Sequence, residues 1–371
     1  MGFFPNNPVF MYQAQRLLAE CSPGGGEATE IGWAVDRITE GDFDSWYSGW
    51  TWLGDRARVN GEQALASGHR VSAREHLFRA ANYYRQANFF LTFDDPHQIT
   101  TWKKMASNFK EAGNLADPPF EWIASPYESG HTLPGFIVRP NGAKGRLPTI
   151  VYLNGADGTK EESWFLGKGF VDRGANFVTI DGPGQGEPLR LHKLYSRPDY
   201  EAAVSPLLDL LMQREDIDLS RVALVGVSMG GYYAGRVACY EPRFRCIVLH
   251  GACHNIHDDL YENFPPIRPH LQWVTGTFND GKARTLLQEF DLGPHLHRIK
   301  SPVFVCHGTE DFLVNPTAAE KTFNGLINVS DQNKKLRYFT AEENAGMHVQ
   351  LNNPTEGYPV VFDWVIDQLT R

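Results

Sequence analysis

The sequence predicts an α/β fold, with a doubly wound and mostly parallel sheet, preceded by a module made only of helices. Helical periodicity dominates up to about residue 115, whereas short apolar runs typical of strands alternate with helix-length segments after Asp117-Pro-Pro. In this second part a serine flanked by glycines, Ser228, stands between a strand-like run and a helix-compatible run. Because two successive prolines cannot continue a helix, we place the boundary there, between a helical module over residues 1–117 and an α/β domain over 118–371.

Three stretches of the first part have apolar residues at helical spacing: residues 44–65, 72–91 and 101–112. Ser72, with Glu75 three residues later, fits a capping box and predicts the start of the second helix. We expect most aromatic residues of this module to be core. Whether its helices form a homodimer or only cover a pocket is left open.

Seven short apolar runs of the second part are expected to be strands: residues 133–139, 149–153, 176–180, 221–225, 246–250, 303–307 and 335–339. The segment between the fifth and sixth of them, residues 254–298, is longer than an ordinary connection and rich in aromatic residues. This segment is a candidate cap over a site. Its Tyr261, Phe264 and Trp273, together with Tyr232 after the serine, are candidate substrate contacts.

Bulk properties favour a neutral or apolar small molecule as the partner. The formal net charge is −9 and no run of Lys or Arg occurs, which argues against nucleic acid and anionic membranes. No apolar run approaches the roughly 20 residues of a membrane span, and the start of the chain lacks a basic, then apolar, signal pattern. Five cysteines scattered without C-x-x-C spacing suit reduced thiols, so we expect a soluble, cytoplasmic protein.

The segment Gly226-Val-Ser228-Met-Gly230 predicts a nucleophile elbow. The run 222–225 suits a buried parallel strand, and residues 232–240 can continue as a helix. Glycines two residues before and after the serine allow the strand and helix to approach without clashes of Cβ atoms. A serine on such a turn would expose its Oγ at the carboxyl edge of the sheet.

A serine hydroxyl needs a histidine base, and the imidazole needs a carboxylate to fix its tautomer. In this architecture the chain order is Ser, acid, His. Asp311 follows the apolar run 303–307, and His348 lies in a loop just before the final predicted helix, 360–369. Glu310 is the competing acid, but Asp311 is the better candidate because a carboxylate one residue earlier is expected to point elsewhere.

The loop after the run 149–153 is expected to supply one N–H of an oxyanion hole, from Ala156, with the second from Met229. Asp157 in that loop would lie beside the scissile carbonyl, or it is simply a turn residue of an Asp-Gly pair. These two interpretations stay open.

The remaining histidines and the glycine-rich loop at Asp181 give weaker indications of function. Most of the remaining histidines, His250 and His307 at strand ends included, are interpreted as surface or capping groups. His254, His257 and Asp258 have no well-spaced further partner, so we expect no metal and no cofactor. The Asp181-Gly-Pro-Gly-Gln-Gly186 loop lacks the Lys-Ser/Thr of a phosphate loop and is interpreted as a structural loop that shapes the pocket.

Together the Ser228 elbow, the Gly155-Ala-Asp-Gly-Thr-Lys-Glu-Glu loop, the Asp181 loop and the Ala-Asn-Tyr-Tyr-Arg-Gln-Ala-Asn-Phe segment resemble a group of α/β-hydrolases. The group includes 2,6-dihydroxypseudooxynicotine hydrolase and fungal hydrolases that shorten polyketide naphthopyrones. The resemblance implies an enzyme of secondary metabolism that cleaves a carbon–carbon bond next to a ketone in an aromatic or polyketide β-dicarbonyl substrate. It also implies a Ser228, Asp311 and His348 triad. Asp157 departs from the nicotine-pathway enzyme, which has a glutamate in this loop.

Three alternatives remain at this point. The same triad serves a carboxylesterase or lactonase, because only the leaving group differs. An acyltransferase or cyclase would use the same pocket. A catalytically silent binding protein of this fold is the alternative from another class, and the intact Ser228, Asp311 and His348 argue against it.

Overall fold

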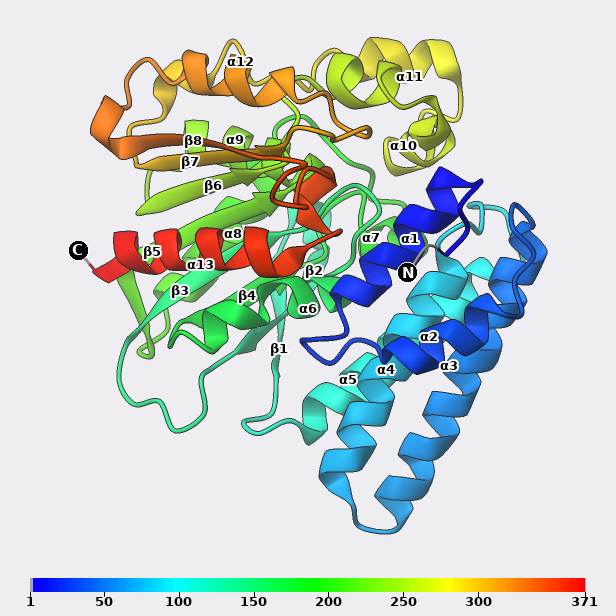
Figure 1. Ribbon diagram of the computed structural model, residues 1–371. Coiled ribbons are helices and arrows are strands. Elements are labelled where there is room, and N and C mark those ends of the chain that lie inside the picture. The colour runs from blue at the N-terminus through cyan, green and yellow to red at the C-terminus, as the bar shows by residue number, and fades with distance from the viewer. Residues whose placement is uncertain (1–2, 371) are drawn as a thin grey trace. The chain divides into compact units, whose positions relative to one another are not determined.

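The computed structural model describes residues 3–370, which divide into two compact units, one up to Phe120 and one from Glu121 onward (Figure 1). Across this described range no helix is both long and apolar enough to cross a membrane. Whether the first unit folds as a domain by itself, with the boundary predicted at residue 117, stays a prediction.

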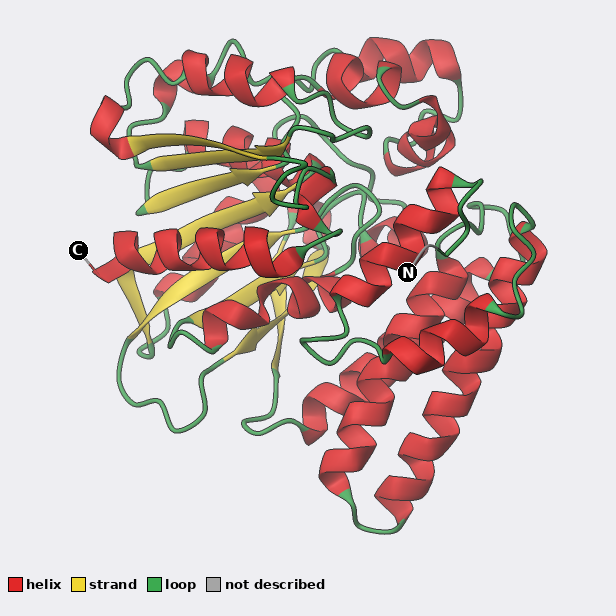
Figure 2. Ribbon diagram, in the orientation of Figure 1, coloured by secondary structure: helices red, strands yellow, loops and turns green. Residues whose placement is uncertain are grey.

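The first unit consists of helices (Figure 2), and its long helices pack closely through glycines. Gly54 lies against the ring of Tyr84 and Gly61 lies against Leu77, where a Cβ atom would come within 2.8 and 2.9 Å. The helices are α1 (Pro8–Ala19), α2 (Ala28–Val35), α3 (Phe43–Ala66), α4 (Arg70–Asn88) and α5 (Gln98–Leu115).

The predicted capping box at Ser72 is wrong. Helix α4 begins at Arg70 after His69, which makes no side-chain cap, so Ser72 lies inside the first turn. Gly68, with φ +78°, reverses the chain within two residues of the end of α3, and the Ala73 N–H already donates to the His69 carbonyl. The tight turn therefore starts the helix earlier than the Ser-Glu pair indicates.

The second unit is built on one sheet of eight strands, in the order β1-β2-β4-β3-β5-β6-β7-β8. Pairs β1–β2 and β2–β4 are antiparallel and all the others are parallel, which confirms the predicted fold class. The strands are β1 (Glu121–Pro126), β2 (Thr132–Val138), β3 (Leu147–Leu153), β4 (Asn176–Ile180), β5 (Ile217–Val227), β6 (Cys246–His250), β7 (Val303–Gly308) and β8 (Lys334–Phe339). Strand β1 was not predicted, because it is a mostly solvent-facing edge strand that pairs only with β2.

Helices cover both faces of the sheet (Figure 1). On one face α6 (Lys160–Val171) contacts α13 (Pro354–Thr370), and on the other α8 (Glu201–Met212) contacts α9 (Met229–Tyr240). The remaining helices are α7 (Gly186–His192), α10 (Arg268–Val274), α11 (Asp280–Leu287) and α12 (Thr317–Gly325). Strands β3 to β8 run in one direction, so the loops that follow them gather at one edge of the sheet.

The segment proposed as a cap, residues 254–298, lies between β6 and β7 and is helical. It contains a π-helical turn (His257–Glu262), a 3-10 turn (Pro265–Ile267), α10, α11 and a second 3-10 turn (Leu296–Arg298). Figure 2 shows α10 and α11 beyond the arrowheads of the strands, on the side where the carboxyl-end loops lie.

Candidate active site

Ser228 occupies a sharp turn between β5 and α9. Its backbone has φ 57° and ψ −127°, a conformation that residues with a side chain rarely adopt. A Cβ atom at Gly226 would lie 2.0 Å from the Gly230 carbonyl oxygen, and one at Gly230 would lie 2.3 Å from the Leu153 carbonyl oxygen. The two glycines therefore allow β5, α9 and the end of β3 to approach as closely as they do.

Asp311, in the loop after β7, lies in contact with His348. His348 Nδ1 is 2.5 Å from Asp311 Oδ2, and both side chains are buried. The other carboxylate oxygen, Oδ1, accepts the N–H groups of Leu313 and Val314 at 3.0 and 2.9 Å. Burial alone would raise the pKa of Asp311, but the charge of His348 and hydrogen bonds from His307 and His348 hold the pKa below its usual range. The carboxylate is therefore kept ionised.

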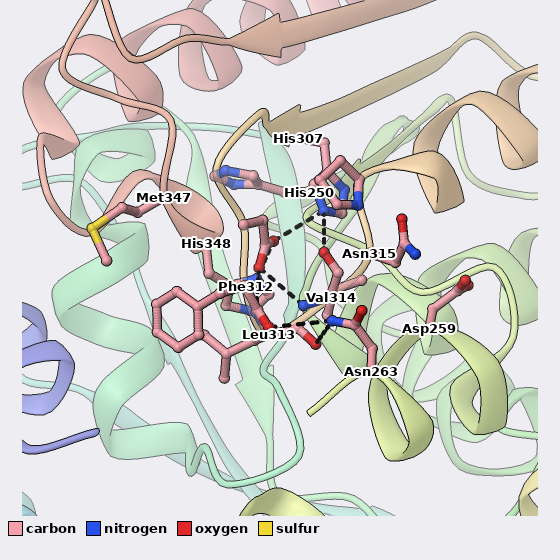
Figure 3. A network of polar contacts seen from close by, with 12 residues as sticks. His250, Asp259, Asn263, His307, Phe312, Leu313, Val314, Asn315, Met347 and His348 are labelled. Atoms are coloured by element: carbon pink, nitrogen blue, oxygen red, sulfur yellow. Dashed lines mark hydrogen bonds and ion pairs between the residues drawn. The ribbon is translucent and has the colours of Figure 1, made fainter. Parts of the chain in front are cut away.

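His307 also contacts the carboxylate of Asp311. Its Nε2 lies 3.0 Å from Asp311 Oδ2 and donates to the Val314 carbonyl at 3.1 Å (Figure 3). His250, at the end of β6, has Nε2 2.5 Å from Gln350 Oε1, and burial lowers its pKa to about 4. The interpretation of both histidines as surface or capping groups is wrong, because both are fully buried. Each stands at the carboxyl end of a buried parallel strand. That position in the sequence is the signal that could have predicted their burial.

The residues His250 and Gly251 lie between His348 and the turn of Ser228. The His250 carbonyl accepts the Ser228 N–H at 2.8 Å. At Gly251, a Cβ atom would lie 3.4 Å from His348 Cε1, so the imidazole packs directly on this backbone. Ser228 and His348 thus border the same two residues at the end of β6.

The loop after β3 lies against Ser228. A Cβ atom at Gly155 would be 3.2 Å from Ser228 Cβ and 3.5 Å from Ser228 Oγ. Ala156 follows in the same loop and is buried, and Met229 begins α9. Asp157 is half-buried in this loop. Ala156, Met229 and Ser228 therefore come from two adjacent loops at one edge of the sheet.

The aromatic residues predicted to contact substrate differ in their surroundings. Tyr232 is fully buried, and its hydroxyl donates to the Pro198 carbonyl at 3.1 Å. Tyr261 is also buried, and its hydroxyl donates to Asp280 at 2.8 Å. Both hydroxyl groups thus bond to the protein itself, and a contact of either residue with substrate stays a prediction.

Two half-buried aromatic residues of the segment 254–298 lie near the loops of the site. Phe264 packs edge-on against Phe312, the residue after Asp311. Trp273 packs against His270, whose Nε2 donates to the Ala156 carbonyl at 3.1 Å. The segment thus contacts the loop that carries Asp311 and the loop of the predicted oxyanion hole.

The Asp181 loop, which follows β4, holds the start of α6. The Asp181 carboxylate accepts the Lys160 backbone N–H and the Lys160 ammonium, each at 2.7 Å. The same ammonium lies 2.7 Å from Glu161, and all three side chains are buried. Between residues 3 and 370 no cluster of three or more His, Cys, Asp or Glu side chains is arranged to hold a metal ion.

Comparisons with known proteins agree with this architecture. Residues 169–370 match the prolyl oligopeptidase family, and residues 35–266 match the FrsA-like esterases. Hydrolase acrC of Aspergillus aculeatus is 29% identical over 99% of this chain and 97% of its own. The 20-hydroxy-prefusarin hydrolase FUS2 of Gibberella moniliformis is 29% identical over 96% of this chain and 95% of its own.

Among solved structures, 2,6-dihydroxy-pseudo-oxynicotine hydrolase matches with a TM-score of 0.83 and 26% identity, covering 95% of each chain. This similarity confirms the resemblance inferred from the sequence motifs. Both family matches span more than half of the chain, and both families are hydrolases. The chain therefore belongs to the α/β-hydrolases, in the prolyl oligopeptidase and FrsA-like esterase families, and it is an enzyme of the hydrolase class.

Proposed function

We propose that the enzyme hydrolyses a carbon–carbon bond next to a ketone in an aromatic or polyketide β-dicarbonyl substrate, with Ser228, His348 and Asp311 as its triad. The similarity to 2,6-dihydroxy-pseudo-oxynicotine hydrolase, at 26% identity over 95% of both chains, is the observation that carries the proposal. The similarity to FUS2, a hydrolase of 20-hydroxy-prefusarin, supports a bulky secondary-metabolite substrate. No cofactor is needed for this chemistry.

In the proposed first step, Ser228 Oγ attacks the ketone carbon and its proton passes to His348 Nε2. Asp311, hydrogen-bonded to His348 Nδ1, fixes the tautomer in which Nε2 carries the lone pair and acts as the base. The carbonyl oxygen becomes an oxyanion, which the N–H groups of Ala156 and Met229 stabilise.

Collapse of this intermediate then breaks the carbon–carbon bond. The electron pair of that bond leaves on carbon as an enolate, delocalised onto the second carbonyl, and protonated His348 delivers the proton to that carbon. The acyl group stays on Ser228 as an ester. A water molecule, deprotonated by His348, hydrolyses this ester and releases a carboxylic acid. Asp157, half-buried in the neighbouring loop, is the alternative proton donor.

The test uses a synthetic 1-aryl-1,3-diketone and the Ser228→Ala variant. We expect the wild-type enzyme to give a carboxylic acid and a methyl ketone, with one ¹⁸O atom in the acid when the reaction runs in H₂¹⁸O. Ser228→Ala should lose turnover and retain its thermal unfolding transition. Ser220→Ala, at the exposed far end of the same strand, is the matched control and should retain full activity. Undiminished activity of Ser228→Ala would remove the serine from the mechanism.

A carboxylesterase or lactonase is the second candidate, favoured by the match of residues 35–266 to the FrsA-like esterases. An ester analogue of the same diketone separates the two functions, because an esterase yields an acid and an alcohol and leaves the diketone intact. Labelling by a fluorophosphonate probe that is lost in Ser228→Ala would exclude a catalytically silent protein.

A further inference from the structure

Gln185, in the loop between β4 and α7, makes four hydrogen bonds through its buried side chain. Its Nε2 donates to the carbonyl oxygens of Asn154 and Gly155, each at 2.8 Å. Its Oε1 accepts the Gly182 N–H at 3.3 Å and the Tyr200 hydroxyl at 3.2 Å. Both hydrogens and both lone pairs of the amide are used, which fixes its orientation.

The carbonyls that Gln185 binds lie at the predicted oxyanion hole. The Gly155 carbonyl and the Ala156 N–H belong to one planar, trans peptide group, in which the two bonds point in opposite directions. A donor that holds the Gly155 oxygen therefore directs the Ala156 N–H to the other side. The Gly155 N–H is already bonded to the Asn154 side chain at 2.8 Å. Within residues 121–370, the Ala156 N–H makes no hydrogen bond.

We propose that Gln185 is a positioning residue that aims the Ala156 N–H at the substrate oxyanion. This inference rests on the proposed function in requiring Ser228 as the nucleophile, and it is independent of whether carbon or oxygen leaves. A glutamine suits the task because two carbonyl oxygens need two hydrogens from one rigid, neutral group. An ionised carboxylate would repel both oxygens. A lysine or arginine would add a charge close to the reacting atoms.

The loop around Gln185 is built to hold that amide. A Cβ atom at Gly182 would lie 1.9 Å from the Tyr200 hydroxyl oxygen, so only glycine allows the tyrosine to reach Gln185 Oε1. Tyr200 is itself fully buried and stacked on Tyr233, with ring centroids 3.6 Å apart. Rigid neighbours therefore fix Oε1 of the amide. Its Nε2 in turn holds the Asn154 and Gly155 carbonyls of the loop after β3.

The experiment compares two inhibitors in the full-length enzyme. With an aryl trifluoromethyl ketone, Ser228 Oγ bonds to the ketone carbon, the hydroxyl proton passes to His348, and the ketone oxygen becomes an oxyanion. The corresponding aryl trifluoromethyl alcohol binds without this adduct. In Gln185→Met, which removes both donated hydrogens, we expect the inhibition constant of the ketone to rise about 10²-fold and that of the alcohol to change less than threefold.

Gln288→Met, a matched change at an exposed glutamine, should shift the ketone constant less than threefold. If Gln185→Met does not fold, Gln185→Glu at pH 8 replaces it, since it keeps both accepted hydrogen bonds. Equal shifts for ketone and alcohol, or no shift for the ketone, would overturn the positioning role.

Failure of the proposed nucleophile has a different signature. Ser228→Ala should abolish the advantage of the ketone over the alcohol. If the ketone keeps its advantage in Ser228→Ala, the serine proposal falls, and the role of Gln185 falls with it. If the advantage depends on Ser228 but not on Gln185, only the inference about Gln185 is overturned.

Discussion

Replacing Asp311 by Asn exchanges a single oxygen for an NH₂ group. Asp311 Oδ1 accepts two backbone N–H groups at 2.9 and 3.0 Å, so the amide oxygen of the variant must stay at that position. The NH₂ group then takes the place of Oδ2, where His348 Nδ1 lies at 2.5 Å and His307 Nε2 at 3.0 Å. The NH₂ group of the variant is a donor and cannot accept a hydrogen bond from His348 Nδ1. We therefore expect His348 to accept from the amide at Nδ1 and to carry its proton on Nε2. That tautomer cannot deprotonate Ser228.

The loss expected from the wrong tautomer is about 10⁴ in kcat, or about 5.4 kcal/mol of transition-state stabilisation. We would measure it with a p-nitrophenyl ester, which needs no knowledge of the natural substrate, and follow the rate of fluorophosphonate labelling in parallel. Glu310→Gln is the matched control and should stay within twofold, because Glu310 is exposed. A kcat for Asp311→Asn within tenfold of wild type, at unchanged thermal stability, would refute the reasoning. An equal loss in Glu310→Gln would assign the acid to the neighbouring residue.

Three further outcomes follow from particular contacts. His250 has a pKa of about 4 in the folded protein against 6.5 for a free side chain, so its neutral form is favoured by folding and stability falls as the pH drops from 6.5 to 4. In denaturant titrations over that window, wild type should lose about 3 kcal/mol more than His250→Gln, and parallel curves would contradict this. Gly230→Ala should destabilise by more than about 3 kcal/mol, because its Cβ atom would meet the Leu153 backbone oxygen at 2.3 Å. Gly281→Ala in α11, where the nearest atom is at 3.4 Å, should change the free energy of unfolding by less than about 1 kcal/mol; equal effects of the two changes would argue against the close approach of α9 to β3. Because Ser228 has φ 57°, Ser228→Gly should be about 1 kcal/mol more stable than Ser228→Ala while both are inactive, and the reverse order would show that the turn is not strained.

The mostly parallel sheet and the three candidate residues Ser228, Asp311 and His348 could be predicted because each leaves a signal in the local sequence or in the chain order. Buried parallel strands are continuous apolar runs, and β4 and β6 have the predicted bounds. The glycines on either side of Ser228 indicate that the strand before it and the helix after it approach each other closely. Asp311 follows a strand and His348 precedes the last helix, so chain order alone selects them.

Contacts between distant parts of the chain could not be predicted in the same way. His307 shares the Asp311 carboxylate with His348, yet in the sequence it is an ordinary residue at the end of a strand. Gln185 lies 30 residues from Gly155, and nothing in the Asp181 loop indicates which carbonyl its amide binds. Such contacts are set by the order of the strands, because β4 is the neighbour of β3 and its loop therefore meets the loop after β3.

The helical segment 254–298 is attached to both sides of the candidate site, which gives it a way to influence the reaction. On the acid side, Asn263 donates to the carbonyls of Phe312 and Leu313 at 3.2 and 3.0 Å. On the oxyanion side, His270 donates to the Ala156 carbonyl at 3.1 Å. Asp311 and the Gly155 carbonyl also accept hydrogen bonds from Val314 and Gln185, respectively. Their positions therefore do not depend on this segment alone. If this segment contacts the substrate as predicted, we expect substitutions in it to alter which substrates bind, while the bonds to Asp311 and to the Gly155 carbonyl persist.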